Sequence, residues 1–177
     1  MGRKIALLRG INVGGGNKVP MADLRALGEG LGWRRVETVI QSGNLLFEAD
    51  GEGLDAALEA AIEAHFGLRI PVVVRSAEEW AGFIAANPFP DAAGAEPQRL
   101  MLTLSKAPLA PDAEGRLAEE ALMGERVAVA AGAIWIHYAG GAWGSKLMPG
   151  YIDKAAGSPA TSRNWRTASK IGELLRG

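Results

Sequence analysis

Cysteine is absent from the 177 residues of the chain, which excludes disulfides, thiolate zinc sites and cysteine nucleophiles. An excess of one charge is also lacking: 19 basic and 20 acidic residues give a formal net charge of -1. Attraction to nucleic acid or to an anionic membrane would therefore need local clustering of charge. No apolar run approaches the roughly 20 residues of a membrane span, and the short apolar start before Arg9 is not a signal peptide. These absences predict a soluble, cytoplasmic protein.

Side chains suited to catalysis are scarce as well. His65 falls near the end of an Ala-rich predicted helix and His137 falls inside a predicted hairpin, and neither has the neighbours of a triad or of a metal site. Paired carboxylates such as Glu119 and Glu120 belong to a solvated helix face. The sequence therefore names no catalytic residue, no metal ligand and no cofactor, and it leaves open whether the protein is an enzyme.

The composition is that of a globular protein, with 48% hydrophobic and 22% charged residues. In the first half, apolar periodicity and Gly or Pro punctuation predict strands at 4–11, 36–41, 44–48 and 69–76, and helices at 20–32 and 53–67. This β-α-β-β-α-β order is typical of the ferredoxin-like split βαβ fold. In that fold strand one lies beside strand three, so the loop after strand one and the tight turn at Ser42-Gly43 should meet at one end of the sheet.

The second half repeats the pattern more loosely. We expect helices at 78–86, 112–124 and 163–176, a strand at 98–104, and a hairpin at 125–141 that turns near Gly132. The Pro-, Ala- and Gly-rich stretch between the halves resembles a linker. The sequence thus predicts an α+β protein with antiparallel sheets, in which subdomains 1–87 and 97–177 are joined by a connecting segment at 88–96.

The loop after strand one, within "LLRGINVGGGNKVP", has the composition of an anion site without a known nucleotide motif. Gly16 and Asn17 stand where a P-loop needs Lys and Ser or Thr, and Val19 replaces the third glycine of a dinucleotide fingerprint. A strand that runs through glycines into a helix N-terminus still presents backbone N–H groups to an anion. The alternative is that the glycines only permit a tight loop with positive φ.

Three basic residues stand near predicted helix starts, namely Lys18, Lys146 and Arg163. A cation at a helix N-terminus opposes the helix dipole and costs about 0.3–1 kcal/mol. An anionic ligand would explain all three together. The alternative is that each one reaches a nearby carboxylate or extends into water.

The segments "IALLRGINVGGGNKVPMADLRAL", "VIQSGNLLF" and "TSRNWRTASKIGEL" resemble DUF1697, a domain of unknown function found in mostly bacterial proteins. The resemblance spans essentially the whole chain, and it implies two ferredoxin-like subdomains and no established reaction. The family pattern transfers onto three groups of residues: Arg9, Gly10, Asn12, Gly14, Gly15, Lys18, Met21 and Leu24; Gln41, Ser42, Gly43 and Asn44; and Lys146, Thr161, Arg163, Asn164, Trp165, Thr167 and Lys170.

Three functions follow as hypotheses. The first is binding of an anionic, phosphate-bearing small molecule or nucleotide, with ligand-binding residues Arg9, Asn12, Lys18, Ser42, Asn44, Lys146, Arg163 and Asn164. The second is a protein-protein interaction or oligomerisation module, whose oligomeric state the sequence does not define. The third, nucleic-acid binding, is not favoured, because Phe47 is the single aromatic residue on strand three. No membrane partner is expected.

Overall fold

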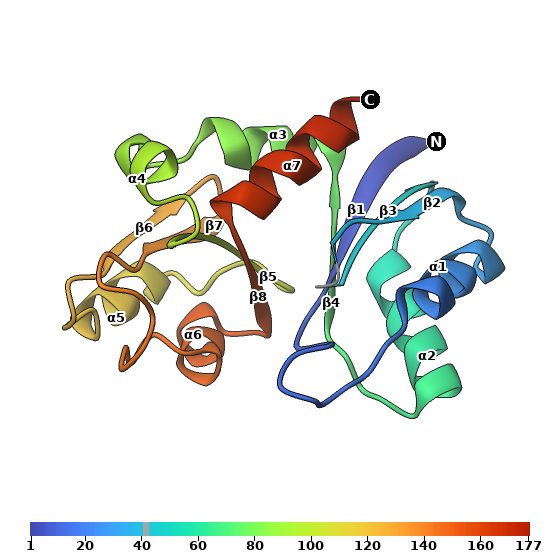
Figure 1. Cartoon of the computed structure of the whole chain (residues 1–177), viewed down its shortest axis with the longest axis horizontal. Coiled ribbons are helices and arrows are strands. Elements are labelled where there is room, and N and C mark those ends of the chain that lie inside the picture. The colour runs from blue at the N-terminus through green and yellow to red at the C-terminus, as the bar shows by residue number, and fades with distance from the viewer. Residues whose placement is uncertain (41–42) are drawn as a thin grey trace. The chain divides into compact units, whose positions relative to one another are not determined.

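The computed structural model describes residues 1–40 and 43–177, and Figure 1 shows the order of its helices and strands. The strands are β1 (Gly2–Leu8), β2 (Arg34–Thr38), β3 (Asn44–Ala49), β4 (Val72–Ser76), β5 (Leu100–Ser105), β6 (Arg126–Ala130), β7 (Ala133–His137) and β8 (Ala160–Asn164). The helices are α1 (Met21–Gly30), α2 (Leu54–Phe66), α3 (Ala77–Ala85), α4 (Pro90–Ala95), α5 (Ala113–Glu119), α6 (Pro149–Ala156) and α7 (Trp165–Arg176). The chain is thus a mixed α+β protein.

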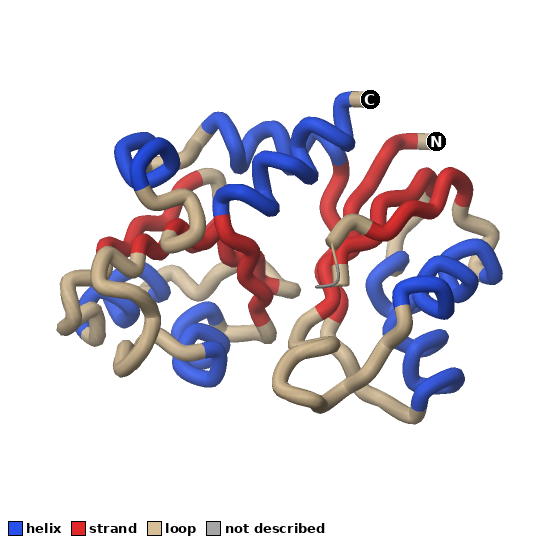
Figure 2. The backbone as a smooth tube through the Cα atoms, viewed as in Figure 1, coloured by secondary structure: helices blue, strands red, loops and turns tan. Residues whose placement is uncertain are grey.

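The first sheet is four-stranded and antiparallel, with the strand order β2-β3-β1-β4. Helices α1 and α2 lie against one face of it (Figure 2). Alternate residues of β1 and β3, such as Ala6, Leu8 and Phe47, turn towards these helices and form a buried core. Trp33 stacks on Phe47 in that core, with ring centroids 3.8 Å apart.

The opposite face of the first sheet is apolar and buried too. Ile5, Leu7 and Leu46 alternate with the residues that face the helices, and all three are almost fully inaccessible. Burial on both faces explains why these strands read as continuous apolar runs instead of alternating ones. Phe47 is itself fully buried, so strand β3 presents none of the exposed aromatic surface that RNA-recognition motifs use.

The second sheet is also four-stranded and antiparallel, with the order β6-β7-β5-β8. Its core includes Ile134 and Ile136 of β7, together with Leu117 of α5 and Ile152 of α6. Trp135 points to the other face and is fully buried as well. Each sheet therefore has helices between its strands and two apolar faces.

The structure confirms several sequence predictions and corrects others. Strand one does lie beside strand three, and the second-half hairpin does turn at Ala131-Gly132. The helix predicted at 163–176 is confirmed as α7, but it begins at Trp165. Residues 160–164 instead form β8, which the sequence did not predict and which pairs with β5 from Ser105↔Ala160 to Met101↔Asn164. The ladder hydrogen bonds to β5 outweigh the local pattern of "TSRN", which looks like a helix start.

The Pro-, Ala- and Gly-rich segment 88–96 also differs from its prediction as a plain connection, because most of it forms α4. Pro90 occupies the first turn of this helix, where a missing N–H costs nothing. Two elements end earlier than predicted. Strand β1 ends at Leu8 instead of residue 11, and helix α5 ends at Glu119 instead of residue 124.

The chain divides into two compact units. Unit 1 contains Met1–Trp80 and Glu173–Gly177, and unit 2 contains Ala81–Gly172. Helices α3 and α7 each have residues in both units. The predicted subdomain bounds of 1–87 and 97–177 do not coincide with these units, and they remain a prediction about which segments fold independently.

Two edge strands have a backbone N–H that is bonded to a carboxylate. At the start of β4, the Val72 N–H donates to Glu59 Oε1 of α2 at 2.9 Å. On β6, the Val129 N–H donates to Glu114 Oε2 of α5 at 2.6 Å. In each case a helix that covers the sheet also occupies a donor at its edge.

Candidate functional site

The loop between β1 and α1 is held together by the side chain of Asn12. Its Nδ2 donates to the Val19 carbonyl and its Oδ1 accepts from the Val19 N–H, both at 2.9 Å. The Asn12 N–H donates to the Asn17 carbonyl at 3.2 Å, and Asn17 Nδ2 donates to the Gly10 carbonyl at 3.2 Å. The predicted ligand-binding residue Asn12 is therefore engaged in closing the loop.

The closed loop borders a pocket of about 330 Å³. Its lining consists of Asn12, Gly15, Gly16, Lys18, Val19 and Pro20. Gly14 and Gly15 have φ of 61° and 79°, which supports the simpler interpretation that glycine permits this loop. The exposed Lys18 has no ion pair within residues 1–40 and 43–177, so its charge faces solvent at the pocket.

The loop meets the β2-β3 connection, as the predicted topology requires. The Leu8 N–H donates to the Gly43 carbonyl at 2.8 Å. A side chain on Gly43 would stand 2.9 Å from Leu8 Cβ and from Ile11 Cδ1, and Gly43 has a φ of 78°, so only glycine fits there. Ser42, a predicted ligand residue, and Gln41 of the family pattern lie outside the described residues.

The remaining predicted residues of unit 1 are bonded to the backbone. Asn44 is fully buried, and its Nδ2 donates to the Val39 carbonyl at 2.9 Å. Arg9 is half-buried, and its N–H donates to the Pro71 carbonyl at 3.1 Å. These bonds join the ends of neighbouring strands, so they position the loop and the turn relative to each other.

Three predicted residues lie in unit 2. Lys146 forms an ion pair with Glu120 at 3.2 Å. This agrees with the alternative in which the lysine reaches a nearby carboxylate instead of a ligand. Asn164 accepts the Thr167 N–H at 3.0 Å and so caps the first turn of α7. Whether these residues complete the loop site of unit 1 remains a prediction.

Arg163 lies on β8 and not in a helix, so the helix-dipole argument does not apply to it. In register it is directly opposite Leu102, which in turn faces Trp135, and these side chains share the sheet face that is turned away from α5 and α6. Arg163 Nη1 donates to Thr161 Oγ1 at 2.8 Å and to the Ser162 carbonyl at 2.9 Å. Burial lowers the pKa of the guanidinium to about 10, and it therefore stays charged at neutral pH.

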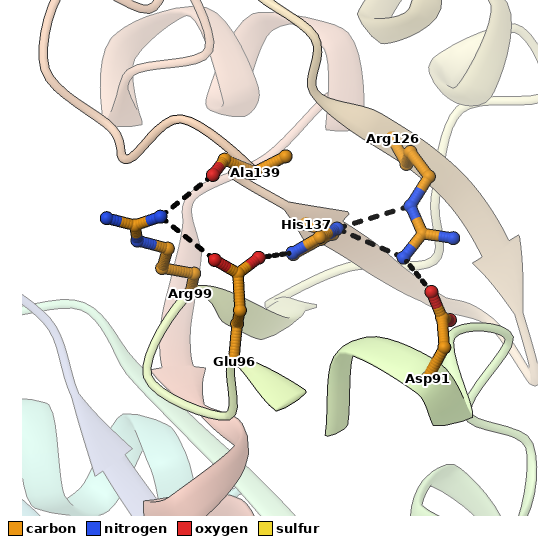
Figure 3. Close-up of polar contacts among 6 residues, drawn as sticks. All are labelled: Asp91, Glu96, Arg99, Arg126, His137 and Ala139. Atoms are coloured by element: carbon orange, nitrogen blue, oxygen red, sulfur yellow. Dashed lines mark hydrogen bonds and ion pairs between the residues drawn. The ribbon is translucent and has the colours of Figure 1, made fainter. Parts of the chain in front are cut away.

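A polar network that the sequence did not predict surrounds His137 (Figure 3). His137 Nε2 lies 2.8 Å from Glu96 Oε2, and Arg99 Nη1 donates to Glu96 Oε1 at 2.9 Å and to the Ala139 carbonyl at 2.8 Å. On the other side of the ring, Arg126 lies within 3.2 Å of His137 Nδ1 and donates to Asp91 Oδ2 at 2.8 Å. The network joins α4 and the segment after it to β6 and β7.

The geometry of this network defines which nitrogen of the His137 imidazole carries the proton. An arginine only donates hydrogen bonds, so His137 Nδ1 must accept and the proton must be on Nε2, directed at Glu96. The hydrogen bond from His137, together with the charge of Arg99, holds the pKa of Glu96 below its usual range. Both ring nitrogens are occupied, so this arrangement fixes strands and offers no general base.

Glu125 is the centre of a second buried network in unit 2. Its Oε1 accepts from Ser145 Oγ at 2.5 Å and its Oε2 accepts from the Met123 N–H at 2.8 Å. Burial by itself would raise the pKa of Glu125, but these hydrogen bonds hold it below its ordinary value. Nearby, Tyr138 donates to the Leu147 carbonyl at 2.7 Å, and burial followed by the charge of Glu125 raises its pKa to about 12.

Sequence patterns did not identify these two networks because their members are far apart in the chain. Glu96 and His137 are 41 positions apart, and Glu125 and Ser145 are 20 apart. One available signal was the single polar His in the apolar run "AIWIH". In the described part of the chain, no three His, Cys, Asp or Glu side chains form a metal-binding group, and no helix has the length and hydropathy to cross a bilayer.

The fold and the candidate residues define an α+β protein with two four-stranded antiparallel sheets and a glycine-rich loop at one end of the first. The chain belongs to DUF1697, described as a protein family of unknown function, whose model matches residues 1–135. The motif "TSRNW" lies beyond that match. The structure is similar to that of the conserved bacterial protein SP0830 from Streptococcus pneumoniae, with 28% identity, 98% coverage of both chains and a TM-score of 0.77. No curated protein matches the chain.

Proposed function

We propose that the protein binds a small anionic molecule at the β1-α1 loop, with Lys18 supplying the positive charge. The observation that carries this proposal is the pocket of about 330 Å³ beside Lys18, which forms no ion pair in the described part of the chain. Because Asn12 closes the loop with its own hydrogen bonds, the pocket is formed before any ligand arrives. A preformed site loses less conformational entropy on binding.

The chemistry of the pocket favours a phosphate or carboxylate group on a small molecule. Its volume is at the lower end of the range of small-molecule sites, about 300–1,000 Å³. Gly15 and Gly16 bring backbone close to the ligand without side chains in the way. Asp23 already provides an acidic group in the first turn of α1, so Lys18 and the loop amides, more than the helix dipole, would recognise the anion.

We predict that a ligand from a panel of phosphate-bearing and carboxylate metabolites raises the unfolding temperature of the wild-type protein and not of Lys18→Ala. At a hundred times its Kd, such a ligand adds about 2.7 kcal/mol to the free energy of unfolding. Thermal unfolding with and without each compound measures this shift.

The matched control is Lys154→Ala, which removes an exposed lysine from α6. This variant should keep the full ligand-induced shift. A shift that survives in Lys18→Ala, or is lost equally in both variants, would remove Lys18 from the site, and a panel without any shift would contradict the proposed function.

Each unit, in this proposal, is a ferredoxin-like split βαβ fold. The two strand orders support it, because β2-β3-β1-β4 and β6-β7-β5-β8 are the same order when the second set is numbered from its own first strand. The intervening helices occur at equivalent places, with α1 and α2 matching α5 and α6. A split βαβ fold brings the loop after its first strand next to the turn before its third strand, which is where the proposed ligand would bind.

A further inference from the structure

Unit 2 exposes large apolar side chains on two of its connections, the segment 120–125 between α5 and β6 and the segment 138–148 between β7 and α6. Trp143 is 93% exposed, Leu122 is 68% exposed and Met123 is 56% exposed. Met148, at the end of the second connection, is half exposed as well. Single exposed apolar residues are ordinary, but a cluster on adjoining loops is characteristic of an interaction surface.

The two connections are in contact with each other, next to α5 in Figure 1. Met123 Cε lies 3.7 Å from the position that a Cβ on Gly144 would take, and the Met123 carbonyl lies 4.0 Å from the corresponding position on Gly140. Met123 therefore lies against the loop that carries Trp143. We call Leu122, Met123, Trp143 and Met148 the apolar patch.

A buried carboxylate fixes the two connections relative to each other. Glu125 accepts hydrogen bonds from the Met123 N–H on one connection and from the Ser145 hydroxyl on the other. Ser145 Oγ in turn accepts the Leu147 N–H at 3.1 Å. The exposed side chains thus project from a braced support, and a braced aromatic residue loses little entropy when it binds.

We propose that the apolar patch binds the same patch on a second copy of this chain. A two-fold contact requires a surface that is complementary to itself, and this one contains both halves of two favourable pairings. The indole of Trp143 is a partner for methionine sulfur, which Met123 supplies. Lys146 and Glu120 provide charges of opposite sign beside the patch, and within one chain they pair at 3.2 Å. Across a two-fold axis, Lys146 of one copy can also face Glu120 of the other.

The size of the patch predicts how strong this association is. An aromatic side chain buries about 150–250 Å². Trp143 is the one aromatic member of the patch and the other three side chains are smaller and only partly exposed, so together they fall short of the ~800 Å² per partner of a standard interface. The dimer is therefore weak and depends on concentration, in the class of transient contacts.

Sedimentation of the full chain over a wide range of concentrations tests this proposal. We expect a reversible monomer-dimer equilibrium for the wild type and a monomer for Trp143→Ala, with the same unfolding temperature because the side chain is almost fully exposed. Val13→Ala, which shortens a 68% exposed residue of unit 1, is the matched control and should dimerise like the wild type.

A charge exchange separates this contact from unspecific apolar association. Lys146→Glu should weaken the dimer at least tenfold, because it places like charges together across the axis. A Glu120→Lys chain should likewise fail to pair with itself. Mixing it with the Lys146→Glu chain restores opposite charges across the axis, although neither chain regains its own Lys146–Glu120 pair, so the mixture should form a heterodimer. Loss of association in the mixture as well as in each variant alone would contradict the proposed pairing.

A wild-type chain that sediments as a monomer at every concentration would overturn the proposal. So would a dimer that Trp143→Ala leaves unchanged. If the monomer instead cosediments with neutral lipid vesicles in a manner that depends on Trp143, the patch belongs to a lipid surface and not to a second copy.

Discussion

At the scale of single residues, the polar side chains that stand out in the sequence are mostly bonded to backbone. Asn12 closes a loop, Asn44 joins two strand ends and Asn164 caps a helix. Asn is common in these roles because its short amide mimics a peptide group. The sequence thus identifies polar residues with a structural or binding role. It does not distinguish the two roles, because an asparagine that binds a ligand and one that binds backbone can stand in the same sequence motif. Lys18, exposed and beside the loop pocket, has surroundings that fit a ligand.

The two histidines allow a residue-scale prediction. His137 is buried with both ring nitrogens engaged, whereas His65 is exposed. His137→Ala should lower the free energy of unfolding by about 2–3 kcal/mol. It leaves a cavity, and it removes the ring that Arg126 and Glu96 each contact through a different nitrogen. His65→Ala should change it by less than about 0.5 kcal/mol. Urea unfolding of the two variants measures both values, and equal effects would contradict a structural role for the His137 network.

At the scale of helices and strands, the sequence predicts the order of the elements correctly where apolar periodicity is strong. The β-α-β-β-α-β order of the first half and the hairpin at Gly132 follow from that periodicity. Strand β8 was missed because "ATSRN" contains few apolar residues, and its stability comes from β5, a partner about 60 positions away. Helix α4 was missed because its Pro, Gly and Ala content resembles a linker. Local sequence cannot supply a distant partner or a tertiary contact.

Two glycine substitutions should have opposite effects at this scale. Gly43→Ala places a Cβ 2.9 Å from Leu8 and Ile11 at a φ of 78°, so it should destabilise the protein by at least about 2 kcal/mol. Gly115→Ala, inside α5 with no atom within 4 Å of the new Cβ, should stabilise it by about 0.5–1 kcal/mol. Thermal unfolding distinguishes the two. A neutral Gly43→Ala would show that the β2-β3 connection can move away from β1.

At the scale of the whole molecule, acid sensitivity follows from carboxylates whose pKa is lowered in the folded chain. A hydrogen bond from Arg126 lowers the pKa of Asp91, and a hydrogen bond from His137 lowers that of Glu96. A carboxylate with a lowered pKa stabilises the fold fully above its ordinary pKa, and that contribution is lost as the pH falls through the folded pKa. The free energy of unfolding should therefore decrease below about pH 4.5, the ordinary value for Glu.

The variant Glu96→Gln isolates one part of this dependence. Glutamine keeps a hydrogen-bonding group near His137 and Arg99 but does not titrate. We expect the difference in unfolding free energy between the wild type and Glu96→Gln to shrink as the pH is lowered from 6 to 3. Chemical unfolding at a series of pH values measures it, and a constant difference would contradict the role of Glu96.

The carboxylates that occupy donors on β4 and β6 bear on how the chain avoids amyloid. An edge strand with unoccupied N–H groups can recruit another chain and begin a fibril. Glu59 and Glu114 each occupy one such donor and add a negative charge that repels a second edge of the same kind. The two carboxylates that complete the helix-sheet contacts therefore also make these edges poor templates for cross-β growth.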